Sequence, residues 1–85
     1  MADNHNYVPD AGFVPDERTA IQIAEAVLTP IYGADAVKHE RPFAASLKDG
    51  VWTVVGSLPR GAVGGVALVE ISSKDGRIRR VSHGR

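Results

Sequence analysis

The sequence predicts a small α+β domain in which one long N-terminal helix packs on a four-stranded antiparallel meander sheet. One segment repeats its apolar residues at helical spacing, and several later segments alternate apolar and polar residues or run as valine-rich stretches. The tripeptide KDG occurs at 48–50 and again at 74–76, each time between two such segments. Because Asp-Gly favours the tight turns that join antiparallel strands, we expect two successive hairpins.

The length of 85 residues is enough for one domain. Residues 1–13 are polar, contain a proline and a glycine, and show no sustained periodicity, so they are predicted to form a flexible N-terminal arm. Residues 14–85 form the single predicted α+β domain. A chain of this size buries only about 60 to 65% of its unfolded surface, so a partner that covers part of it would add stability.

The predicted helix follows Asp16, whose carboxylate can accept a hydrogen bond from an unpaired backbone N–H of the first turn. Gly33 is placed to end the helix, and Pro30 is expected to kink or alter the last turn. The apolar face of this helix is formed by Ala20, Ala24, Val27, Leu28 and Ile31.

The strands are expected at 43–48, 51–58, 65–72 and 77–83, after a short connection around residues 34–40. The second and third strands are linked by GSLPRGAVGG, residues 56–65. Its four glycines match neither phosphate-binding spacing, and no helix follows them, so the stretch is interpreted as a strand connector. The four-stranded order is therefore a simple meander.

Several functional classes are disfavoured by composition. The chain has no cysteine, ten basic and ten acidic residues, and few aromatic residues, so disulfides, thiolate metal sites and a nucleic-acid partner are not expected. No long apolar segment predicts a membrane partner, and we expect a cytoplasmic protein. The spacing of the histidines matches no metal motif, and no nucleophile elbow is present. We therefore expect no metal, no cofactor and no enzymatic activity.

Two local features have alternative interpretations. His39 beside Glu40 could form an acid/base pair with His83 if the fold brought them together, but three unconnected surface histidines is the simpler interpretation. Trp52 is expected either in the core or, less readily, as a binding hot spot. The basic C-terminal segment RIRRVSHGR fits a charged edge strand, or a surface that faces an acidic protein partner.

Three longer segments and one short one carry a family resemblance, in order over residues 14–84: VPDERTAIQIAEAVLTPIYG, ERPFAASLKDGVWTVVGSLP, GGVALVEISSKDGRI and SHG. The chain resembles bacterial immunity proteins of the nuclear transport factor 2 (NTF2) fold, a cystatin-like cone of curved sheet around a helix. Full members of that fold are longer, so the resemblance implies a reduced cone. It also implies a protein that neutralises a cognate toxin of a polymorphic toxin system by binding and occluding it. Candidate contact residues, chosen by position, are Trp52, Arg60, Arg77, Arg79 and Arg80.

Other functions stay open at this point. A cystatin-like or PepSY-like domain that binds a ligand or inhibits a peptidase would share the same layout, as would a small cone-fold enzyme. A homodimer is also expected to be possible, since one helix covers only one face of a sheet and apolar residues are predicted on both faces. The apolar residues that suggest two apolar faces are Val51, Val55, Ala67, Val69 and Ile71.

Overall fold

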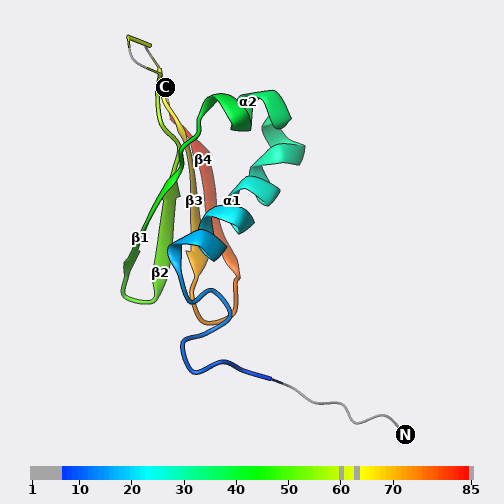
Figure 1. Cartoon of the computed structure of the whole chain (residues 1–85), viewed down its shortest axis with the longest axis vertical. Coiled ribbons are helices and arrows are strands. Elements are labelled where there is room, and N and C mark those ends of the chain that lie inside the picture. The colour runs from blue at the N-terminus through cyan, green and yellow to red at the C-terminus, as the bar shows by residue number, and fades with distance from the viewer. Residues whose placement is uncertain (1–6, 60, 63, 85) are drawn as a thin grey trace, which may run out of the picture.

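The computed structural model describes residues 7–59, 61, 62 and 64–84. Within these residues the chain forms helices α1 (Glu17–Tyr32) and α2 (Ala34–His39), then strands β1 (Ala44–Lys48), β2 (Val51–Val55), β3 (Ala67–Ser72) and β4 (Ile78–His83). The strands form one antiparallel sheet in the order β1-β2-β3-β4, with α1 across one face (Figure 1). The predicted α+β meander is thus confirmed. Residues 1–6 of the predicted arm lie outside the described residues, as does Arg60.

Helix α1 begins and ends where the sequence indicates. The Asp16 side chain accepts a hydrogen bond of 2.8 Å from the backbone N–H of Thr19, as an N-cap does. Gly33 follows the helix with a φ of 96°, a conformation that glycine adopts without strain, and its N–H donates to the Thr29 carbonyl. Pro30 lies inside the last turn, and the helix continues past it to Tyr32.

A second helix replaces the expected connection around residues 34–40. Helix α2 spans Ala34–His39 and begins directly after Gly33. Its buried side chain is Val37, which belongs to the core. A helix of six residues shows no helical periodicity in the sequence, and one so short depends on tertiary packing for its stability.

The two KDG turns differ in detail. Asp49 and Gly50 have φ angles of 51° and 77°, so the β1–β2 connection is a tight two-residue turn, as predicted. In the second hairpin the register shifts between Glu70 and Ile71: Glu70 pairs with Arg80, but Ile71 pairs with Ile78. Arg79 is therefore an extra residue in β4, at a β-bulge.

Strands β2 and β3 are shorter than expected. The prediction extended the second strand to residue 58, but β2 ends at Val55 because the N–H of Ser57 turns to the Glu40 carbonyl at 2.8 Å. The prediction began the third strand at residue 65, whereas β3 begins at Ala67. The backbone N–H of Gly56 still donates to the Ala67 carbonyl, so the two strands stay paired at their ends.

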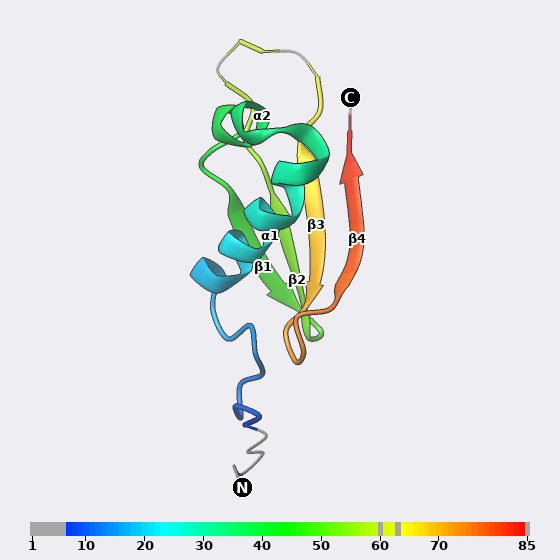
Figure 2. The ribbon, with the colours of Figure 1, turned by 90° about the vertical axis from the view of Figure 1, so that its right-hand side faces the viewer.

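The core lies between α1 and the first three strands. The backbone of α1 lies close to β1, β2 and β3 but not to β4, which is the ribbon at the right-hand edge of Figure 2. Two residues of the predicted helix face are not in the core: Val27 is half-buried, and Ile31 is 55% exposed. The buried apolar residues are Val14, Ala20, Ala24, Leu28, Val37, Phe43, Trp52, Val54, Ala67, Val69 and Ile71.

The segment before α1 runs along the β3–β4 turn. The N–H groups of Phe13 and Val14 donate to the carbonyls of Lys74 and Ser73, both at 3.0 Å. Gly12 is buried with a φ of 87°, and a side chain there would overlap the Ser73 carbonyl. Glycine is therefore required where this segment meets the turn.

Candidate partner-binding edge and the Glu40–His83 cluster

Local hydrogen bonds fix the backbone of the residues that lead into β4. The Arg77 carbonyl accepts from the Ser72 N–H at 2.8 Å, and the Arg77 N–H donates to Asp75 Oδ1 at 2.9 Å. This backbone hydrogen bond, followed by one from the Ser72 side chain, holds the pKa of Asp75 below its ordinary value. The backbone is thus fixed while the Arg77 side chain is exposed to solvent.

Three of the predicted contact residues share the β4 side of the sheet. Arg77, Arg79 and Arg80 are all exposed. Arg80 Nη1 lies 3.8 Å from Glu70 Oε2 on the neighbouring strand, and its side chain keeps 60% of its surface exposed. Among the described residues no ion pair involves Arg77 or Arg79. Together with Ile78, these two arginines line a shallow surface hollow.

The other two predicted contact residues do not join this group. Trp52 is 5% exposed, and its indole Nε1–H donates a 2.8 Å hydrogen bond to the Val14 carbonyl. The structure therefore places Trp52 in the core, which was the first of its two interpretations. Arg60, which lies in the sequence between β2 and β3, is outside the described residues.

Glu40 and His83 are brought together from distant parts of the chain. Glu40 Oε1 accepts from the Ala67 N–H at 2.7 Å, and Glu40 Oε2 lies 3.0 Å from His83 Nε2. The other ring nitrogen, His83 Nδ1, lies 2.9 Å from the Gly84 carbonyl. Both ring nitrogens of His83 thus lie within hydrogen-bonding distance of an oxygen atom. His39, the third member of the suggested pairing, is exposed on α2.

This arrangement ties the end of α2 to the ends of the strands. The ring of Tyr32 lies 5.2 Å from that of His83, centroid to centroid. A side chain at Gly56 would overlap the Glu40 carboxylate, so the glycine makes room for the link. Each carboxylate oxygen of Glu40 contacts a protein group, one the Ala67 N–H and the other His83 Nε2. The Glu40–His83 cluster therefore links the end of α2 to β3 and β4.

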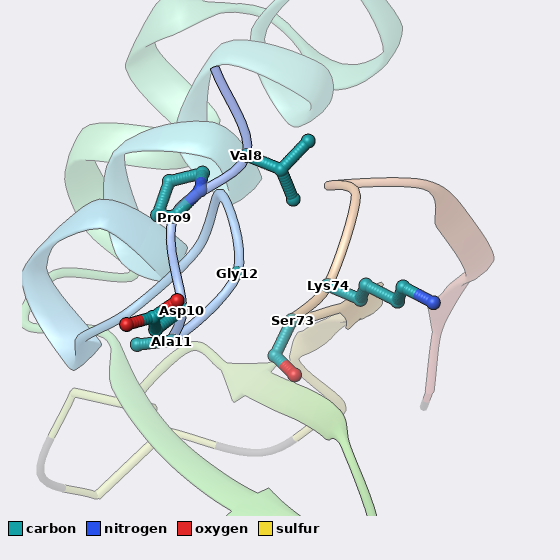
Figure 3. Close-up of a pocket in the computed structure, with 7 residues that line it drawn as sticks. All are labelled: Val8, Pro9, Asp10, Ala11, Gly12, Ser73 and Lys74. Carbon is teal, nitrogen blue, oxygen red and sulfur yellow. The ribbon is translucent and has the colours of Figure 1, made fainter. Parts of the chain in front are cut away.

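The main surface hollows lie away from Glu40 and His83. The larger one is at the β3–β4 turn and is lined by Val8, Pro9, Asp10, Ala11, Gly12, Ser73 and Lys74 (Figure 3). In Figure 3 the Lys74 side chain extends away from Asp10, so the hollow does not present a converging set of charged groups. Neither this hollow nor the one at Arg77–Arg79 includes a residue of the Glu40–His83 cluster.

In the part of the chain that the structure describes, no group of three or more histidine, aspartate or glutamate side chains is arranged to hold a metal ion. Across the same residues, no helix is long and apolar enough to cross a membrane.

Sequence reasoning missed two of these features. The link from Glu40 to the N–H of Ala67 joins residues 27 positions apart, and only the pairing of strands reveals it. The close approach of Gly12 to the β3–β4 turn had a weak signal, a glycine four residues before the helix cap, which the prediction assigned to a flexible arm.

Comparison with known proteins gave a family match. Residues 19–85 match the model of a family described as NTF2 fold immunity protein. Two uncharacterized proteins of Escherichia coli (strain K12), YhhH and YbbC, are each 33% identical to the chain over 73 residues. The match covers 85% of this chain, 58% of YhhH and 60% of YbbC, so the chain spans about three fifths of the length of these relatives. No solved structure matches it.

Proposed function

The chain belongs to the family of immunity proteins with the NTF2 fold, and on this basis we propose that it neutralises a cognate bacterial toxin of a polymorphic toxin system by binding and occluding it. In this proposal it acts without catalysis and without a cofactor. The cytoplasm is the proposed site of action, and the lack of cysteine agrees with a reducing compartment.

The proposed binding mode rests on one observation: the arginines at β4 are exposed. The body of α1 lies over the other three strands and meets β4 through the Tyr32 ring at His83, and the segment around β4 exposes Arg77, Arg79 and Arg80. Arginine is enriched at protein interfaces, where its planar guanidinium group binds carboxylates through paired hydrogen bonds. We therefore propose that this side contacts an acidic face of the toxin.

The experiment that tests this proposal is co-expression with the toxin-like product of an adjacent gene. We expect a complex that co-purifies in fixed stoichiometry, and growth that is restored when the chain is present. The double variant Arg77→Glu/Arg79→Glu should lose both effects. Arg18→Glu is the matched control, because Arg18 is an exposed arginine on α1, away from β4, where it should not alter binding. If no adjacent product binds and the chain protects against none, the proposal is wrong.

A second candidate function comes from the proximity of Glu40 and His83. Their 3.0 Å contact is the geometry an acid/base pair would need, as in a small cone-fold enzyme. Against it, Glu40 also holds the Ala67 N–H, and the hollows described above lie elsewhere. The variant Glu40→Gln distinguishes the two roles. If Glu40 is a structural link, the variant should have a lower free energy of unfolding, and its folded fraction should still protect against the toxin. If Glu40 is catalytic, the variant should lose protection while its free energy of unfolding stays unchanged.

We also propose that two copies of the chain form a homodimer through the open face of the sheet, the face opposite α1. Ala67, Val69 and Ile71 lie buried under α1, so they do not contribute apolar surface to the second face. On that face Val51 and Val55 are half-buried. Light scattering after size exclusion should give about twice the monomer mass of 9.0 kDa if the open face pairs. A monomer at high micromolar concentration would contradict this.

A further inference from the structure

We propose that β4 accepts an extended acidic segment of the toxin as a fifth strand of the sheet. The segment would pair with the outward-facing backbone groups of Val81 and His83, and its carboxylates would bind the arginines beside them. This inference rests on the proposed function, because it identifies the part of the toxin that the chain recognises.

The hydrogen-bond pattern of β3 and β4 identifies the backbone groups that face outward. The N–H of Gly84 donates to the Val66 carbonyl at 3.1 Å, which makes these residues a hydrogen-bonded pair. In an antiparallel ladder, hydrogen-bonded pairs alternate with pairs that are not hydrogen-bonded. The next pair, Ala67 with His83, and the pair Val69 with Val81 are therefore of the second kind. The N–H and C=O groups of His83 and Val81 point away from β3.

This outer edge is accessible. Strand β4 ends the sheet order, α1 packs on the other three strands, and no other ribbon lies beyond β4 in Figure 2. Among the described residues, the backbone hydrogen bonds of turns and loops do not use the outward groups of Val81 or His83. A strand added here would satisfy them, which is how extended peptides bind exposed sheet edges.

The charges beside the edge favour an acidic strand. Arg77, Arg79 and Arg80 lie within four positions, and the carboxylate facing them from β3 is Glu70, at 3.8 Å from Arg80. Opposite charges across neighbouring strands stabilise the pairing, and like charges destabilise it. A second copy of β4 would bring its own arginines to the same edge, so charge repulsion disfavours that occupant. The bulge at Arg79 limits regular pairing to residues 80–83, which a short segment of about five residues would cover.

The first test uses a synthetic peptide as the probe. A capped eight-residue peptide of alternating glutamate and valine is titrated into the isotope-labelled chain, and amide hydrogen exchange is measured. We expect the amides of Val81 and His83 to exchange at least tenfold more slowly at saturation. The matched peptide with lysine for glutamate should leave them unchanged. Equal protection by both peptides, or protection confined to the open face or to the hollow at Gly12, would overturn the proposal.

Variants at Val81 test the backbone contact directly. Val81→Pro removes an N–H that points outward, so no hydrogen bond to β3 is lost, and peptide affinity should fall at least tenfold. Val81→Ala is the matched control, since it trims the side chain but keeps the N–H and should keep the affinity. If the proline variant does not fold, Arg77→Glu/Arg79→Glu replaces it, and its preference should switch to the lysine peptide. An unchanged preference would contradict the inference.

Binding of the toxin itself separates this inference from the proposed function. Weaker toxin binding by Val81→Pro, with Val81→Ala unaffected, supports both. Full toxin binding and protection by both the proline and the charge-reversal variants would leave the proposed function standing and overturn strand addition. If the unaltered chain fails to bind toxin but still pairs with the glutamate peptide, the toxin role is wrong and the acidic-strand edge stands.

Discussion

Strands β3 and β4 are joined by one short turn and pair along their length, but they lie in different environments. In β3 every second side chain is buried, namely Ala67, Val69 and Ile71. In β4 no side chain is fully buried, and the half-buried apolar one is Val81. The pair Ile71 and Ile78 shows the difference best, because the same side chain is 0% exposed on one strand and 37% exposed on the other.

The difference follows from where α1 lies. The helix covers the inner face of β2 and β3, so the apolar residues of these two strands on that face lose contact with water, which stabilises the fold. Beyond the helix, β4 gains little from burial, and its composition is free to serve another purpose. Burial therefore makes β3 the larger contributor to stability, and β4 is the strand that we propose for recognition.

The largest expected effect on stability comes from Ile71→Ala. Removing a fully buried isoleucine side chain leaves a cavity and should lower the free energy of unfolding by about 3 kcal/mol. Its cross-strand neighbour supplies the control: Ile78→Ala should lower it by less than about 1 kcal/mol. Urea denaturation followed by circular dichroism measures both. Equal losses would mean that β4 contributes to the core as much as β3 does.

A smaller loss of stability is expected from Trp52→Phe. The phenyl ring fills most of the same space but lacks the Nε1–H that donates to the Val14 carbonyl, and that buried carbonyl loses its partner. We expect a decrease of about 1–2 kcal/mol in the free energy of unfolding. The Val14 amide, which donates to Ser73, should exchange faster, since the segment before α1 loosens. An unchanged stability would show that this contact adds nothing beyond packing.

Lowering the pH should destabilise the first turn of α1. Hydrogen bonds from the Thr19 side chain and then from its backbone N–H lower the pKa of Asp16. Since the carboxylate ionises more easily in the folded chain, its contribution is present above the ordinary aspartate pKa. It is lost as the pH falls below about 4 and through the lowered folded value.

The variant Asp16→Ala tests this pH dependence. It should be less stable than the unaltered chain at neutral pH, and the gap should narrow on acidification. Chemical denaturation at a series of pH values checks the prediction. Asp75 has a lowered pKa for a similar reason, so some acid sensitivity should persist in the variant. A gap that stays constant down to pH 2 would contradict the assigned cause.

The smallest effect on folding is expected from Arg79→Ala. The side chain is exposed at a bulge and has no ion-pair partner among the described residues, so the free energy of unfolding should change by less than about 0.5 kcal/mol. Arg80→Ala should behave alike, because its contact with Glu70 is long and solvent-exposed. Thermal denaturation measures both. A loss above about 1 kcal/mol would show that the exposed arginines of β4 are needed for stability.

Local signals explain which parts of this fold were predictable from the sequence. The cap at Asp16 and the turn at Asp49-Gly50 depend on neighbouring residues, so they could be located from spacing alone. The end of β2 depends on Glu40, and helix α2 depends on the burial of Val37, so both required the tertiary structure.

The candidate site was predictable in part. The basic character of residues 77–80 is visible in the sequence, and the structure places these residues, exposed, at the start of β4. The sequence also indicated an edge strand here, and β4 does lie at one end of the strand order. Which strands the backbone of α1 covers could not be predicted, because that depends on the direction in which the helix crosses the sheet. The same limit applies to Trp52, whose burial is decided by Val14, 38 positions away in the chain.

The meander also sets the order in which the sheet can form during synthesis. Each strand pairs with the strand that precedes it in the chain, so a growing polypeptide can add strands in sequence without waiting for distant residues. Until β4 is made, β3 is itself the sheet edge, and its unpaired backbone groups can attract other nascent chains. The arginine-bearing strand therefore closes a period of aggregation risk in the newly made protein.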